Sequence, residues 1–293
     1  YWETEVVLTG GHSTADRKAR VAAAQQRLRR ALPALSDPDF EAYAQRHYQP
    51  YWLKVELARK VQHARLLRLA EVEMRSLETE VTTDAYRGVT EITVVAPDHP
   101  RLLSIIAGAC AASGANIVDA QIFTTTDGLA LDTISVSRAF DQDADETRRG
   151  QRIARTVEQA LRGQLKLKEA VAARDDARKD RDKTFAVPPT VRFDNTLSNR
   201  HTVIEVSGLD RAGLLYELTT VISDLNLNIA SAHIATFGEK AVDVFYVADL
   251  TGEKIANPAR EGAIRRRLVE ILGGPAAARA EGRPETRGKR GAA

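Results

Sequence analysis

The chain has few residues of the kinds that build covalent or metal-bound structure. Its 293 residues include one cysteine and one methionine, and aromatic residues make up only 5%. A single cysteine, Cys110, excludes an intramolecular disulfide and a zinc site of the CxxC type, which fits a reducing compartment. We therefore expect a fold held by its apolar cores, with Cys110 as a small core residue.

Strong charge and long apolar runs are also lacking. The net charge is +2, so no nucleic-acid or anionic membrane partner is expected. No run approaches the ~20 apolar residues that span a bilayer, and no signal peptide precedes the fold, which predicts a cytoplasmic location. The chain starts at Tyr1 and its only methionine is Met74, so we expect a fragment of a longer protein.

Hydrophobic residues, at 43%, are enough for two domains. Apolar positions recur at helical spacing before residue 76, and the period then changes to the alternation typical of strands. The predicted segments are a helical region at 1–76, a first α+β unit at 77–163 closed by a strand within 187–197, a charged helical insert or linker at 164–186, a second unit at 201–273, and a disordered basic tail at 274–293.

A repeat relates the two units. The stretch DHPRLLSIIAGACAASGANI at 98–117 returns as DRAGLLYELTTVISDLNLNI at 210–229, and residues 90–124 laid over 202–236 give eleven identities. After the hairpin Asp132 pairs with Asp243. The fold class predicted is α+β: an N-terminal α-helical connector followed by two tandem ferredoxin-like βαββαβ sandwiches. Nothing strand-like follows the second unit, so we expect its last strand to be missing and one sheet edge to be open.

The repeated polar residues allow two interpretations. Asp98 and Asp210 precede a helix, where a carboxylate commonly caps the N-terminus, and Asn116 and Asn228 follow it, where asparagine suits a turn. Alternatively, we expect each aspartate to lie near the asparagine of its own unit, at one end of the sandwich. Free helix N–H groups would then bind a ligand carboxylate, and the Asp and Asn oxygens its ammonium. This predicts an amino-acid pocket.

The pattern D-x-x-G-L-L, followed by an apolar helix and N-I, resembles the ACT domain, a small regulatory module that binds ligands. With YWETEVVLTGG, YWLKVELARKVQHAR and GVTEITVVAPDHPRLL, it resembles over residues 1–272 the C-terminal part of the uridylyltransferase/uridylyl-removing enzymes of the PII protein. The resemblance implies tandem ACT domains that sense glutamine, and residues 1–76 as the connector from an HD-type hydrolase domain. It also implies PII as a partner, and Mg²⁺ or Mn²⁺ in the catalytic domains of the parent enzyme.

Two departures from that family affect the expected activity. None of the six histidines is followed by aspartate, so the hydrolase dyad is absent, and no D-x-D pair follows the Gly-Ser turn of a nucleotidyltransferase. We expect no catalytic residue, metal site or cofactor in this chain. The first unit has Arg101 where the family prefers glycine, whereas the second keeps Gly213, which lets a ligand approach the backbone.

The leading hypothesis is a regulatory segment that senses glutamine or another small amino acid. The alternative is an interaction module that self-associates or recruits PII through an open sheet edge without binding a metabolite. The predicted ligand-binding residues belong to the two repeats and are Asp98, Arg101, Leu102, Asn116, Ile117, Asp210, Gly213, Leu214, Asn228 and Ile229.

Overall fold

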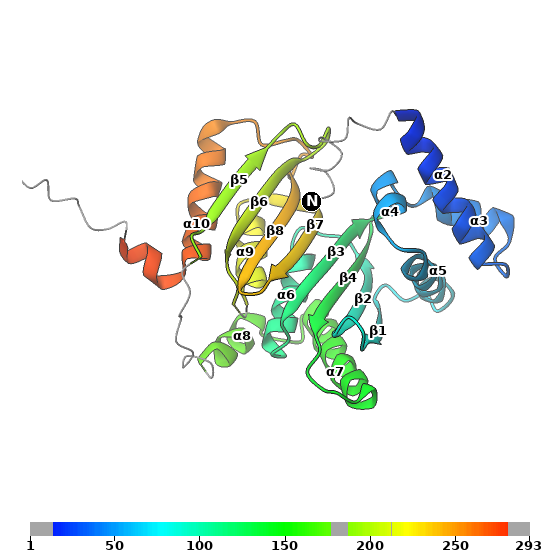
Figure 1. Ribbon diagram of the computed structural model, residues 1–293, viewed down its shortest axis with the longest axis horizontal. Coiled ribbons are helices and arrows are strands. Elements are labelled where there is room, and N and C mark those ends of the chain that lie inside the picture. The colour runs from blue at the N-terminus through cyan, green and yellow to red at the C-terminus, as the bar shows by residue number, and fades with distance from the viewer. Residues whose placement is uncertain (1–13, 177–186, 212, 281–293) are drawn as a thin grey trace, which may run out of the picture.

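A computed structural model describes residues 14–176, 187–211 and 213–280. Two α+β units lie side by side and share one antiparallel sheet with the strand order β1-β2-β4-β3-β7-β8-β6-β5 (Figure 1). Most helices of the two units cover one face of this sheet, and the N-terminal helices lie against the first unit. The predicted α+β class, with helices followed by two tandem sandwiches, is confirmed.

The N-terminal region is helical, as predicted, over its described part. Ser36 caps the second helix by accepting a hydrogen bond from the backbone N–H of Asp39 at 3.3 Å. Buried Tyr51 and Trp52 pack on the face of the sheet that lies opposite the first unit's own helices. On that face the rings of Phe123 and Tyr51 meet edge-on. Residues 1–13 of the predicted connector lie outside the described residues. The helices are α2 (Thr14–Ala31), α3 (Asp37–Gln45), α4 (Gln49–Lys54) and α5 (Leu57–Val72).

Both units have the order ββαββα. The first consists of β1 (Glu78–Asp84), β2 (Val89–Pro97), α6 (Leu102–Ala112), β3 (Ile117–Thr124), β4 (Leu129–Ser137) and α7 (Asp143–Leu161). The second consists of β5 (Thr190–Asp194), β6 (Thr202–Leu209), α9 (Leu214–Asp224), β7 (Leu227–Phe237), β8 (Lys240–Asp249) and α10 (Pro258–Ala280). Alternate strand residues such as Ile92, Val94, Ile204 and Val206 face the helices and form the shared core.

The placement of the strand within 187–197 in the first unit is wrong. This strand, β5, pairs antiparallel with β6 and belongs to the second unit. The first unit already has the matching strand in β1, which pairs with β2. Each pair is a hairpin with a short connection, which costs less loop-closure entropy than a return from a distant segment. The strand that completes each four-stranded unit thus lies before the repeated segment in the sequence. In the second unit this strand is β5, which covers the edge of β6.

The charged segment 164–186 is partly integrated into the fold. Its helix α8 (Leu167–Asp176) packs on α6, and Val171 is buried. A Cβ atom placed on Gly108 of α6 would lie 2.7 Å from Cδ2 of Leu167, so the glycine allows this close approach without a shift of the leucine. The predicted helical insert is confirmed over α8, whose charged residues Lys168, Glu169 and Arg174 are exposed while Val171 is buried; residues 177–186 lie outside the described part.

The C-terminal segment 274–293 was predicted to be disordered, but α10 continues to Ala280. The alanine-rich sequence that follows Pro275 explains the extension, because alanine has the highest helix propensity. The remaining residues, 281–293, are outside the described ranges. Among the helices that the structure describes, none has both the length and the apolar character that crossing a membrane requires.

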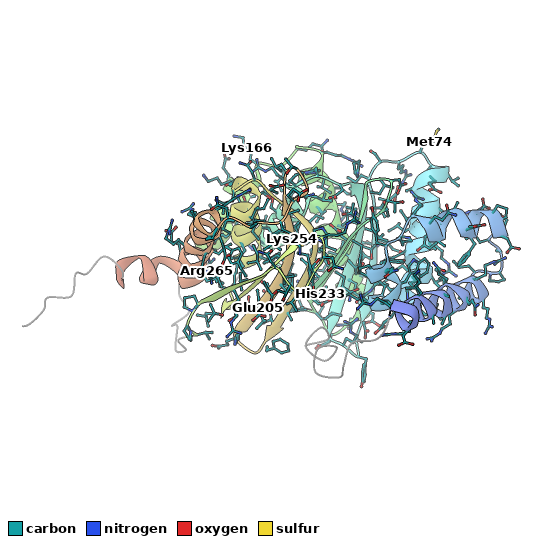
Figure 2. The ribbon with its side chains drawn as sticks, turned by 90° about the horizontal axis from the view of Figure 1, so that it is seen from above. Met74, Lys166, Glu205, His233, Lys254 and Arg265 are labelled. Atoms are coloured by element: carbon teal, nitrogen blue, oxygen red, sulfur yellow. The ribbon has the colours of Figure 1, made fainter. Side chains whose placement is uncertain are left out.

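The units join through the seam, which is the antiparallel pairing of β3 with β7. Its register pairs Asp119 with Ala235, Ala120 with Ile234, and Gln121 with His233. Gln121 and His233 are equivalent positions of the repeat, so a local twofold axis passes between them. Lys54 of α4 contacts His233, with 2.9 Å between Nζ and Nε2, and Figure 2 shows His233 between the N-terminal helices and the second unit.

Candidate ligand site between the two units

The aspartate and asparagine of one unit lie at opposite ends of its sheet. Next to Asp98, Pro97 pairs with Leu129 of β4, whereas Ile117, next to Asn116, pairs with Val136. Seven residues of β4 separate these pairings, or ~23 Å at ~3.3 Å per residue. The expected proximity of Asp98 to Asn116 is wrong, because β2 and β3 run parallel to each other and the helix returns the chain to the starting end.

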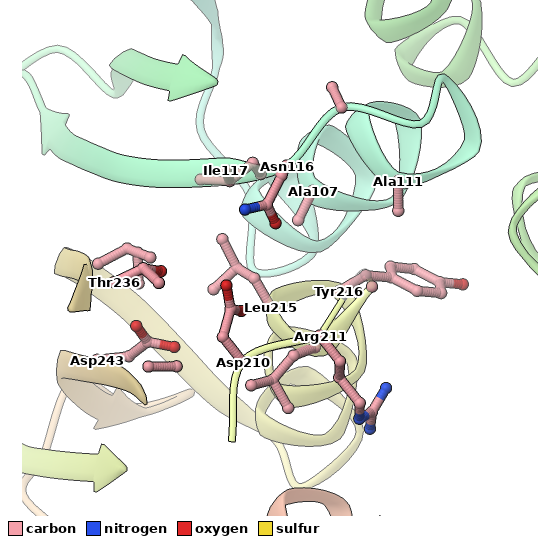
Figure 3. A pocket seen from close by; sticks show the side chains of 15 residues that line it. Ala107, Ala111, Asn116, Ile117, Asp210, Arg211, Leu215, Tyr216, Thr236 and Asp243 are labelled. Atoms are coloured by element: carbon pink, nitrogen blue, oxygen red, sulfur yellow. The ribbon is translucent and has the colours of Figure 1, made fainter. Parts of the chain in front are cut away.

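The antiparallel seam brings the repeated residues together across the units instead. The end of the first unit that carries Asn116 meets the end of the second unit that carries Asp210. The Asn116 amide lies close enough to the Asp210 carboxylate to act against the burial that raises the pKa of Asp210, and Figure 3 shows the two side chains pointing toward one another. The candidate site is therefore shared between the units, and Asn228 is not part of it.

Asp210, Arg211 and Gly213 are the described residues between β6 and α9, and two of them have well-defined backbone features. Gly213 adopts the left-handed conformation with φ of 80° just before α9, where a Cβ atom would be strained. The backbone N–H of Asp210 donates to the carbonyl of Glu239 at 2.7 Å, which anchors the start of the loop. The glycine preserved in this repeat thus serves the backbone turn at the N-terminus of α9.

Small residues of α6 leave a small, partly open cavity beside these residues. Its volume of about 20 Å³ accommodates one water-sized group, since a water needs roughly 10 to 15 Å³ on this measure. Of the predicted site residues, Asn116, Ile117, Asp210, Gly213 and Leu214 line it. The other lining residues are Ala107, Ala111, Ala115, Arg211, Leu215, Tyr216, Ile234, Thr236, Ala241 and Asp243.

The site has a second carboxylate that the predicted residues did not include. Asp243 of β8 is 2% exposed and one of its oxygens, Oδ1, has no hydrogen-bond partner. Burial raises the pKa of Asp243 to about 7, and the nearby Asp210 acts in the same direction, against a hydrogen bond from the Ala235 backbone. Burial also raises the pKa of Asp210, although Asn116 and Thr236 both hydrogen-bond its carboxylate.

A sequence signal for these residues existed in the repeat. Thr236 and Asp243 correspond to Thr124 and Asp132, so the same Asp-Thr-Asp combination recurs in the two units. A carboxylate in the middle of the apolar strand AVDVFYV is unusual, because an unpaired buried charge costs several kcal/mol. The repetition of such a residue indicates a shared role, which alternation along the strand places on the buried face.

The first-unit triad lies at the other end of the seam. Thr124 donates to Asp98 at 2.9 Å, and burial, with Asp98 nearby, raises the pKa of Asp132 well above its ordinary value. Both Asp132 carboxylate oxygens lack a hydrogen-bond partner. Here the loop contacts α9, since Ser223 donates to the carbonyl of Pro100 at 2.7 Å. The structure thus contains a related but different arrangement at this end.

The remaining predicted residues lie around this second end and do not form one cavity. Asn228 and Pro100 line an open groove of about 470 Å³, whereas Leu102 lines a separate groove. Ile229 is a core residue. Arg101 is exposed and starts α6 in an ordinary right-handed conformation with φ of −99°. Arginine in place of glycine therefore coincides with the absence of a left-handed loop here.

The described residues contain no group of three or more His, Cys, Asp or Glu side chains placed to hold a metal ion. The chemistry of the site is that of hydrogen bonds and charge: two carboxylates, an amide and a threonine hydroxyl beside the backbone N–H groups of α9. Such a set suits a small ligand that carries a positive group.

Residues 190–278 match a family model described as an ACR9-like, ACT-like domain. Over 273 residues the chain is 58% identical to the bifunctional uridylyltransferase/uridylyl-removing enzyme of Rhodopseudomonas palustris, covering 93% of this chain and 29% of the relative. The enzyme of the same name from Nitrobacter hamburgensis is 58% identical over 278 residues, covering 95% and 30%. That from Bradyrhizobium diazoefficiens is 57% identical over 274 residues, covering 94% and 29%.

The chain spans less than one third of the length of these relatives. The match extends through the N-terminal helices as well as both sandwiches, because it includes more than nine tenths of this chain. Almost the whole chain thus corresponds to the C-terminal part of the bifunctional uridylyltransferase/uridylyl-removing enzymes, with an ACT-like domain in its second unit.

Proposed function

We propose that this chain is an amino-acid-sensing regulatory segment of a uridylyltransferase/uridylyl-removing enzyme, with glutamine as its effector. The observation that supports this most directly is the meeting of Asn116 and Asp210 across the two units. A ligand bound there would touch both units at once. Its binding free energy would then depend on how the units are arranged, which is the requirement for an allosteric effector.

The groups around the cavity match a free amino acid. The α9 N-terminus with its left-handed Gly213 offers backbone N–H groups to a carboxylate. Asp210 and Asn116 offer oxygens to an ammonium group. The cavity of about 20 Å³ is too small for a whole glutamine, so the units would separate slightly when the ligand enters.

The N-terminal helices offer a route by which such a change would reach the rest of the parent enzyme. Lys54 of α4 contacts His233 at the seam, and Tyr51 and Trp52 of the same helix pack on the first unit. A shift between the units would therefore pull on α4 and α5. In the parent, we propose that these helices connect to the hydrolase and nucleotidyltransferase domains, which act on PII and would use Mg²⁺ or Mn²⁺.

Isothermal titration of the 293-residue chain with glutamine tests this proposal. We expect saturable binding, which Asn116→Ala weakens by about 5- to 50-fold through loss of one hydrogen bond to a charged group. Asn228→Ala is the matched control, because it removes the equivalent side chain at the other end of the seam, and Arg266→Ala is a surface control. No heat from a folded sample, or equal effects of all three substitutions, would contradict the proposal.

The alternative of a pure interaction module depends on an open sheet edge. β5 covers the edge of β6, so the open edge of the second unit is that of β5 itself. The edge strands of the described sheet are β1 and β5. A partner protein would bind either edge strand by adding a strand of its own to the sheet.

A further inference from the structure

The Asp243 carboxylate has no role in the packing of the second unit. Its side chain sits on β8 between Val206 of β6 and Ile234 of β7, in the apolar middle of the sheet. The Ala235 backbone N–H acts against the raised pKa of this carboxyl, and Oδ1 has no hydrogen-bond partner although the residue is 2% exposed. A buried acceptor without a donor costs about 1 to 3 kcal/mol. A leucine or valine here would avoid that cost.

The unsatisfied oxygen belongs to a residue that lines the cavity of about 20 Å³. Asp210, Asn116 and Thr236 line the same space, so every polar side chain directed into it offers an acceptor. Among the described lining residues Arg211 is the only cation. Its guanidinium is directed away, donating to Glu217 at 2.6 and 2.5 Å and to the carbonyl of Ile271 at 3.2 Å. The remaining ionisable lining residue is Tyr216.

We propose that Asp243 and Asp210 form the receptor for a primary ammonium group, which occupies the cavity and donates hydrogen bonds to both carboxylates and to the Asn116 amide oxygen. The cavity volume fits this group, since an ammonium is the size of a water molecule and has three or more donors. The proposal rests on the proposed function, because it assigns one subsite of the same ligand site. The group is either the α-ammonium of an amino acid or a free ammonium ion.

Ammonium binding at this place is coupled to a proton. Without ligand, Asp243 holds a proton below pH 7, because burial raises its pKa to about 7 and Asp210 lies beside it. When an ammonium group enters, this proton leaves to solvent and the two carboxylates face a cation. Ligand affinity therefore increases with pH up to about 7 and levels off above it, with about a tenfold gain from pH 6 to pH 8.

Calorimetry on the 293-residue chain tests the proposal. The probes are L-glutamine, its 2-hydroxy analogue, which lacks the ammonium group, and ammonium chloride. Each titration is run at pH 6 and pH 8 in two buffers of different ionisation enthalpy, which counts the protons released. We expect glutamine to release close to one proton at pH 6 and little at pH 8, and the hydroxy analogue to bind at least tenfold more weakly.

The variant Asp243→Asn keeps the shape of the side chain and removes its charge. It is expected to lower glutamine affinity at pH 8 by at least tenfold and to abolish the change between pH 6 and pH 8. Asp132→Asn is the matched control: it removes the equivalent buried carboxylate of the first unit, which does not line the cavity, and leaves the affinity unchanged. Circular dichroism of both variants confirms that the fold is retained.

The outcomes separate this proposal from the proposed function. Glutamine binding that is unaffected by pH and by Asp243→Asn overturns the ammonium receptor and leaves amino-acid sensing intact. If glutamine does not bind but ammonium chloride does, with loss of binding in Asp243→Asn, the receptor stands and its ligand is the free ion. If neither binds, the receptor is refuted as well.

Discussion

Replacing Asp243 by asparagine should stabilise the ligand-free fold at neutral and higher pH. Burial raises the pKa of this carboxyl from 3.8 to about 7, so the folded chain keeps a proton that the unfolded chain loses. The stability that this group contributes is complete below pH 3.8 and is lost as pH rises to about 7. At ~1.4 kcal/mol for each pH unit, the loss is about 4 kcal/mol above pH 7.

Asparagine avoids this loss because it resembles the protonated carboxyl. Its oxygen accepts the Ala235 N–H, and its NH₂ group can donate to Asp210. Urea unfolding of Asp243→Asn and wild type at pH 5 and pH 8 measures the effect. The stability difference between them should grow by about 3 kcal/mol from pH 5 to pH 8. Asp224→Asn, at an exposed helix end, is the control; a pH-independent difference for Asp243→Asn would refute the reasoning.

Three further substitutions follow from the packing. Gly108→Ala would gain about 1 kcal/mol from helix propensity at an open site, but crowding of Leu167 and Tyr216 at 2.7 and 2.8 Å should cancel this gain or reverse it by up to about 2 kcal/mol; a stabilisation of about 1 kcal/mol in thermal unfolding would exclude the tight contact. Gly213→Ala should cost about 1 kcal/mol for its left-handed φ of 80° and weaken glutamine binding, whereas Gly252→Ala should cost similar stability without changing affinity. Glu146→Ala should cost about 3 kcal/mol or more by urea unfolding, because four donors lose the carboxylate of this fully buried residue; a loss below about 1 kcal/mol would contradict this.

The sequence was sufficient to predict the two sandwiches because their evidence is local. Helical periodicity, the change to alternation near residue 77, and the repeat of 98–117 at 210–229 all depend on short spacings. The strand with which β5 pairs cannot be predicted from such short spacings. The 112-residue offset that relates the repeats also relates Glu78 to Thr190, but these edge strands share almost no residues, so the equivalence of β1 and β5 is clear only from their pairing.

The site could be predicted only in part for the same reason. Asp210, Gly213 and Asn116 were identified by repetition and residue type, and they do line the cavity. Their assignment within one unit failed because it ignored that β2 and β3 are parallel. The contribution of Asn116 to the site of the other unit depends on the seam, which is tertiary pairing between edge strands and has no periodic signal in either strand.

The local twofold axis between Gln121 and His233 relates the two units and lies at the centre of the seam. The seam is short and central. Asp210 and Asn116 line the cavity at one end, and Pro100 and Asn228 line the open groove at the other. A rigid rotation about this pivot that closes one end would open the other. Occupation of one end would thus disfavour the second, giving one ligand per chain even though the repeat supplies two sets of similar residues.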